Sequence, residues 1–162
     1  MTTVPRPVPP SEELVPAPAS TPAPLPAARL MANAAAWLLL VGLLTGGYIA
    51  AAMTGKVTAD PHGAVASHLN ALLGTFLLLG VAWSLPMLRY GPRGQYRIAW
   101  AFIISNFANW AITAVKAWLH VSGVEANGHA ANDAVFGALS LTVVLPSLAA
   151  AVAWVYGFRP RR

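Results

Sequence analysis

The sequence contains no cysteine and few charged residues. Without cysteine, the chain can form no disulfide, no thiolate metal site and no cysteine nucleophile. Charged residues make up 9% of the 162 residues, whereas a soluble domain needs about a quarter of its residues charged to cover its surface. We therefore expect one compact domain whose surface mostly faces lipid.

Several functional motifs are also missing. The chain has no H-x-x-x-H zinc pair, no glycine-rich phosphate loop and no convincing Ser/His/Asp order. The net charge of +5 could suggest nucleic acid, but the cations lie at the ends of apolar runs, where they set membrane topology. We expect no nucleic-acid partner.

The chain divides into two parts by composition. Residues 1–28 are rich in proline and alanine, which predicts a disordered or polyproline II tail. Four apolar runs follow, at residues 30–53, 66–88, 98–120 and 134–158. Each is long enough to cross a hydrocarbon layer of about 30 Å, in which the backbone must be helical. Residues 29–162 are therefore predicted to form an all-α bundle of four transmembrane helices.

The first run resembles a signal peptide, with a cleavage-like Ala50-Ala51-Ala52. Its apolar stretch is long and no short basic region precedes it, so we expect a retained span.

Charge in the loops predicts the orientation. Arginines flank the first helix, the loop between helices two and three, and the end of helix four: Arg29, Arg89, Arg93, Arg97, Arg159, Arg161 and Arg162. The opposite loops hold Lys56 with Asp60, and Glu125 with Asp133. The positive-inside rule places the arginines, and both termini, on the cytoplasmic side of the inner or plasma membrane.

Small residues and one proline bear on packing. The Gly42-x-x-x-Gly46 pattern allows close helix approach, and such faces favour a homo-oligomer. Pro146 lacks a backbone donor and is expected to kink the fourth helix.

Polar residues at membrane depth are functional candidates because they are costly in lipid. Spacings of three and four place one set on a single face of helix three: Asn106, Asn109, Thr113, Lys116 and His120. This face either lines a ligand cavity or forms interhelical hydrogen bonds, with Lys116 reaching the surface.

Helix two carries His68, Asn70 and Thr75, and all four histidines (His62, His68, His120 and His129) map to the non-cytoplasmic half. Imidazole can carry protons and bind metal or haem. We expect the side chains of helices two and three to point toward one another.

Three segments resemble the hydroxylaminobenzene mutases: SHLNALLGTFLLL at 67–79, FANWA at 107–111, and the Asn-Gly-His loop at 127–129. The likeness covers about residues 30–158, and a more distant one is to styrene oxide isomerase. It implies intramolecular rearrangement of a small aromatic substrate: hydroxylaminobenzene to 2-aminophenol, or an epoxide to a carbonyl compound.

The resemblance also implies a b-type haem with His68 as its axial ligand, and a trimer. In the resulting hypothesis His68, Asn109 and His129 are catalytic: Asn109 orients the substrate and His129 relays a proton. Asn70, Thr75, Asn106, Asn109, Trp110 and Thr113 contact the substrate.

Two positions depart from the pattern of these families. Gly74 replaces an asparagine six residues after the histidine, and Phe107 replaces a tyrosine, which leaves the substrate open. The alternative is a non-enzymatic membrane protein, such as a transporter or an assembly subunit.

Overall fold

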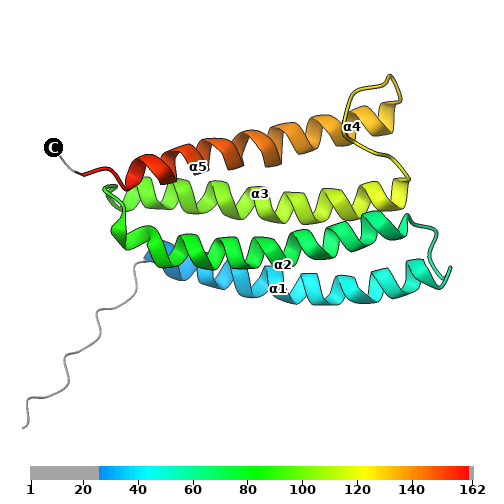
Figure 1. The fold of residues 1–162 in the computed structure, drawn as a ribbon, viewed down its shortest axis with the longest axis horizontal. Helices are drawn as coiled ribbons and strands as arrows, with labels where there is room; N and C mark the ends of the chain where they lie inside the picture. The colour runs from blue at the N-terminus through cyan, green and yellow to red at the C-terminus, as the bar shows by residue number, and fades with distance from the viewer. Residues whose placement is uncertain (1–25, 161–162) are drawn as a thin grey trace, which may run out of the picture.

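The computed structural model describes residues 26–160, which form four long helical spans connected by short loops (Figure 1). The spans are α1 (Pro26–Met53), α2 (Pro61–Ser84) with the 3-10 turn η1 (Leu85–Met87), α3 (Pro92–Leu119), and a fourth span built from α4 (Ala130–Leu139), η2 (Ser140–Val144) and α5 (Leu145–Gly157). Each span has 27 or 28 residues, more than the roughly 20 that cross a bilayer. The predicted all-α, four-helix membrane bundle is confirmed.

The N-terminal tail was expected to end at residue 28, but α1 begins at Pro26. Proline suits the first turn of a helix, where its missing N–H would have no partner. Met31 and Ala27 are buried, so the start of α1 packs into the bundle. Residues 1–25, for which disorder was expected, lie outside the described residues.

The later spans begin before their apolar runs, at residues 61, 92 and 130 instead of 66, 98 and 134. Their polar first turns are nevertheless helical because local signals start the helix. Asp60 caps α2 by accepting from the N–H groups of His62 at 3.2 Å and Gly63 at 2.8 Å. Pro61 and Pro92 occupy the first turns of α2 and α3.

The fourth span changes its hydrogen-bond pattern at mid-length. Ser140–Val144 forms a π-helical turn, in which the N–H of Leu145 donates to the carbonyl of Ser140, five residues earlier. Pro146 follows directly and has no N–H to donate. The break in α-helical geometry thus lies in the turn just before the proline.

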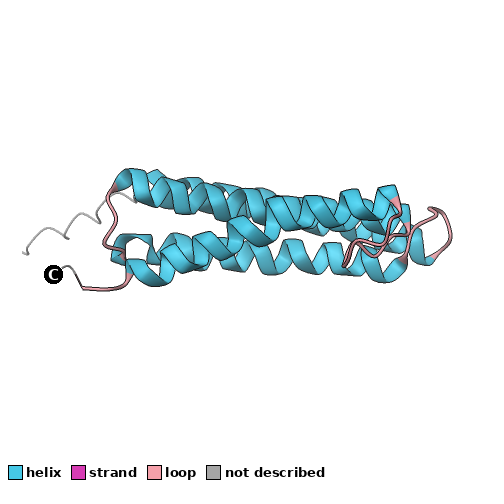
Figure 2. Cartoon of the chain, turned by 90° about the horizontal axis from the view of Figure 1, so that it is seen from above, coloured by secondary structure: helices cyan, strands magenta, loops and turns pink. Residues whose placement is uncertain are grey.

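The spans pack in chain order, with α1 against α2, α2 against α3, and the fourth span mainly against α3 (Figures 1 and 2). Met31, Leu38, Leu78 and Leu85 are wholly buried between α1, α2 and α3. Only 11% of the most apolar 18-residue stretch of the fourth span is buried inside the bundle, whereas 39% of the corresponding stretch of the α2 span is buried. Most of the fourth span therefore presents apolar side chains outward, to lipid or to another protein.

Charge separates the two ends of the bundle. The described arginines lie at the end of the bundle where α1 begins and α5 ends: Arg29, Arg89, Arg93, Arg97 and Arg159 (Figure 1). The opposite end carries Lys56, Asp60, Glu125 and Asp133. The grouping expected from the sequence is present, and a multi-pass membrane protein is confirmed. The cytoplasmic placement of the arginine end stays a prediction.

Candidate functional site

A seam of polar side chains connects α2 to α3. The Nδ2 group of Asn70 donates to Asn109 Oδ1 at 3.3 Å and to Thr113 Oγ1 at 3.1 Å. Ser67 Oγ donates to the backbone carbonyl of Trp110 at 3.0 Å. The structure thus brings together three of the predicted site residues, Asn70, Asn109 and Thr113, and supplies the interhelical hydrogen bonds that were one of the two interpretations of this face.

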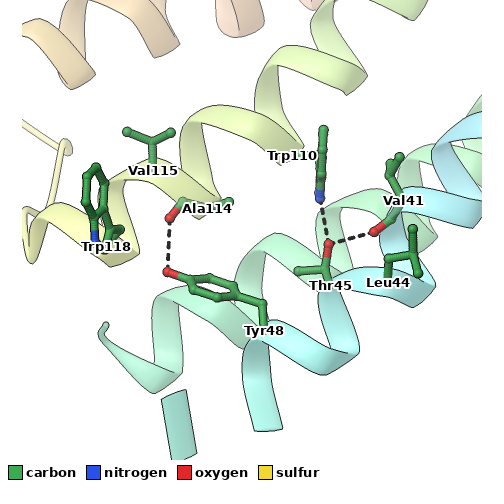
Figure 3. Close-up of a pocket in the computed structure, with 8 residues that line it drawn as sticks. All are labelled: Val41, Leu44, Thr45, Tyr48, Trp110, Ala114, Val115 and Trp118. Atoms are coloured by element: carbon green, nitrogen blue, oxygen red, sulfur yellow. Dashed lines mark hydrogen bonds between the residues drawn. The ribbon is translucent and has the colours of Figure 1, made fainter. Parts of the chain in front are cut away.

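Trp110 belongs to a different surface, the groove between α1 and α3 (Figure 3). Its indole Nε1 donates to Thr45 Oγ1 at 2.9 Å, and Thr45 in turn donates to the carbonyl of Val41 at 2.7 Å. Tyr48 OH donates to the carbonyl of Ala114 over a long 3.4 Å. The indole is thereby held in one orientation by α1.

The groove has a volume of about 490 Å³ and is largely apolar. That is within the range of sites for small organic molecules. Its lining comprises Val41, Leu44, Thr45, Tyr48, Trp110, Ala114, Val115 and Trp118. Two indoles and a phenol ring suit an aromatic guest. Thr45 and Tyr48 were not singled out from the sequence, although they are polar-tipped side chains inside an apolar run.

His68 lies on another face of α2, turned toward α1. Its ring Nδ1 is 2.7 Å from the carbonyl oxygen of Gly42, and the side chain is half-buried. Thr75, two turns on, shares this side, since its hydroxyl lies 2.9 Å from the carbonyl of Ala71 and 3.5 Å from that of Ala35.

The expected convergence of His68 with the amides of α3 is therefore wrong within one chain. His68 and Asn70 are two residues apart, which separates them by about 200° around α2. Asn70 meets α3, whereas His68 meets α1. The polar groups form separate clusters and not one internal pocket.

Asn106 lies at mid-span and faces α2. Its Nδ2 donates to the carbonyl of Phe102 at 2.8 Å, and its Oδ1 lies over Gly74. A side chain at position 74 would need the space that this amide occupies. Gly74, the position that departs from the family pattern, thus leaves the space that the Asn106 amide fills. The second departure, Phe107, is partly buried and packs against the core.

His129 is exposed at the N-cap of α4, where its backbone N–H donates to Asn127 Oδ1 at 3.0 Å. The fourth span packs mainly on α3, and no hydrogen bond joins His129 to His68 within the described part of the chain. Lys116 Nζ donates to the carbonyl of Ser122 at 3.1 Å, in agreement with a lysine that reaches the surface. Within residues 26–160, no three His, Asp or Glu side chains gather closely enough to hold a metal ion.

Comparison with known proteins places the chain in a family. Residues 27–159 match the sequence profile of the family described as styrene oxide isomerase. The chain is also 33% identical over 136 residues to hydroxylaminobenzene mutase HabB of Ectopseudomonas oleovorans, an alignment that covers 80% of this chain and 76% of that protein. No solved structure shows significant similarity.

These matches confirm the expected relationship and set aside the non-enzymatic alternative. The chain belongs to the styrene oxide isomerase family, and it is an isomerase.

Proposed function

We propose that this membrane isomerase moves a hydroxyl group within a small aromatic hydroxylamine, as in the conversion of hydroxylaminobenzene to 2-aminophenol. The similarity to a hydroxylaminobenzene mutase over most of the chain supports this substrate class. Substrate and product contain the same atoms. The N–O bond breaks, and a C–O bond forms at the ring carbon next to the one that bears nitrogen. That ring carbon loses a proton, and the nitrogen gains one. No co-substrate is consumed.

The observation that carries the proposal is the contact between His68 and Gly42. A carbonyl oxygen can only accept, so at 2.7 Å the ring Nδ1 carries the proton. In the neutral imidazole, Nε2 then holds the lone pair. An N–H donated to a backbone carbonyl is the arrangement that orients histidines whose other nitrogen binds a metal.

We propose a b-type haem as the cofactor, because this contact leaves the lone pair of His68 Nε2 free to bind iron. His68 Nε2 would hold it on the half-buried face of α2 beside α1. A ferric haem there would supply a Lewis acid for the departing oxygen. The remaining tasks, binding the aromatic ring and orienting the hydroxylamine, fall to side chains of the protein.

Two surfaces offer those side chains. The α1–α3 groove provides Trp110 and Trp118 for the ring, with Tyr48 OH as a hydroxyl whose long 3.4 Å bond can be exchanged for one to a ligand. On the α2–α3 seam, Asn109 uses Oδ1 toward Asn70, so it would bind a substrate oxygen through its Nδ2 group. His129 is exposed at the N-cap of α4, and the proton relay expected of it stays a prediction.

Because His68 and the groove lie on different sides of α1, we propose that the complete site forms between subunits. Gly42, which contacts His68, and Leu44, which lines the groove, are about 200° apart around α1. A two-fold interface would pair the groove with the groove of the second copy, or the His68 face with the second His68 face. A head-to-tail ring would set the groove of one copy against the His68 face of the next, which favours a cyclic homo-oligomer such as a trimer.

The test is direct. Detergent-purified protein is incubated with hydroxylaminobenzene, and 2-aminophenol is measured by chromatography, with styrene oxide tested in parallel. We expect 2-aminophenol, together with a Soret band in the absorption spectrum of the purified protein. Conversion of the epoxide alone would reject the hydroxylamine as substrate, and a spectrum without a Soret band would reject haem.

A further inference from the structure

Helices α1 and α2 are in close contact at Gly42 and Ala71. A Cβ added to Gly42 would lie 2.8 Å from Ala71 Cβ, a separation that real side chains essentially never adopt. Both residues are buried. A glycine at position 42 is therefore what lets the two backbones come together here.

The same approach brings a main-chain carbonyl to the imidazole. His68 precedes Ala71 by three residues and so lies on the same side of α2. Its Nδ1 reaches the carbonyl oxygen of Gly42 at 2.7 Å. If α1 moved outward to make room for a methyl group at position 42, this carbonyl would move with it.

The other glycines of α1 are not used in this way. Neither Gly46 nor Gly47 has an atom within 4 Å of the position of an added Cβ. The Gly42-x-x-x-Gly46 pattern is thus asymmetric within this chain: one glycine is needed for the contact and the other is open.

We propose that Gly42 is a positioning residue for His68. By lacking a side chain it lets its own carbonyl hold the Nδ1–H tautomer of the imidazole and aim Nε2 away from α1. This inference rests on the proposed role of His68, but it concerns the orientation and tautomer of the ring and can be tested without cofactor or substrate.

The experiment compares Gly42→Ala with Gly46→Ala, in haem-free protein labelled with ¹⁵N-histidine. Both variants gain the same helix propensity, and only the first places a methyl group against Ala71. The ring ¹⁵N shifts report the tautomer, and the His68 signals are identified by their loss in His68→Ala. We expect the Nδ1–H tautomer in the wild type and in Gly46→Ala, and a mixture of tautomers in Gly42→Ala.

Activity adds a second reading. We expect kcat to fall at least about tenfold in Gly42→Ala, and to stay within about twofold in Gly46→Ala. If Gly42→Ala does not fold, the tautomer is measured in the double variant Gly42→Ala/Ala71→Gly, which lacks the opposing methyl group. A folded double variant with the Nδ1–H tautomer restored supports the proposal.

Two results would overturn it: an unchanged tautomer in folded Gly42→Ala, or a double variant whose tautomer is not restored. Failure of the proposed function looks different. If His68→Ala keeps full activity, His68 is not catalytic, yet the ¹⁵N shifts still show whether Gly42 controls its tautomer.

Discussion

The amide oxygen of Asn106 lies 2.6 Å from the position that a Cβ on Gly74 would take. Leu38, which is wholly buried, closes the same space at 2.9 Å. Position 74 therefore has no room for a side chain while Asn106 keeps this conformation. The two residues form a matched pair on facing helices, so an asparagine at position 74 would not fit while Asn106 keeps this conformation.

Gly74→Ala is expected to destabilise the bundle by about 1–3 kcal/mol, because it overpacks a closed interface. Thermal unfolding in detergent measures the loss. Gly80→Ala is the matched control on the same helix, since nothing lies within 4 Å of its Cβ. Truncating Asn106 to alanine should recover part of the loss. Equal stability of the Gly74→Ala and Gly80→Ala proteins would show that Asn106 moves aside freely.

His68→Ala is expected to abolish the Soret band and to lower the isomerisation rate by at least about a hundredfold, because it removes the residue proposed to hold the haem. The absorption spectrum and the rate of 2-aminophenol formation are the measurements. His129→Ala and His62→Ala serve as controls, and both should stay within about threefold of the wild type, since these side chains are exposed. A large loss in His129→Ala would support the proton relay that the sequence suggested.

The hydrogen bond between Asn70 and Asn109 is expected to stabilise the α2–α3 contact modestly. Interhelical bonds in membranes contribute about 0.6 kcal/mol on average and up to about 1.7 kcal/mol. A double-mutant cycle of Asn70→Ala and Asn109→Ala, read from unfolding free energies, should give a coupling of this size. A coupling near zero would indicate that Thr113 alone satisfies Asn70. A large fall in kcat for Asn109→Ala at unchanged stability would assign this amide to the substrate.

Complementation between subunits tests the site formed across an interface. His68→Ala and Trp110→Ala should each be nearly inactive, because one removes the cofactor ligand and the other the aromatic wall of the groove. If each site takes His68 from one copy and Trp110 from its neighbour, an equal mixture of the two should recover about a quarter of wild-type activity in a cyclic oligomer.

The control for complementation mixes His68→Ala with the double variant His68→Ala/Trp110→Ala, in which no intact site can form. Recovery in that mixture would point to contamination. No recovery in the first mixture, with co-assembly shown by pull-down of differently tagged subunits, would mean that the two residues act within one chain or that Trp110 does not serve catalysis.

Much of the fold could be predicted from composition and spacing. The four spans follow from the length of the apolar runs, because a backbone in hydrocarbon must be helical. The polar face of α3 was likewise predicted, and Asn109 and Thr113 do meet a common partner in Asn70. The helix starts were placed too late, since hydropathy does not register caps such as Asp60.

The sequence alone determined the number of spans, the separation of charge between the two ends, and the angular position of each residue on its own helix. Only the tertiary structure decided which neighbour each face meets: His68 and Asn70 contact different helices, and Gly42 is tight while Gly46 is open. The physical reason is that lipid is as apolar as a leucine side chain. Hydrophobicity therefore does not select the rotation of a membrane helix, and close packing and hydrogen bonds to particular neighbours do.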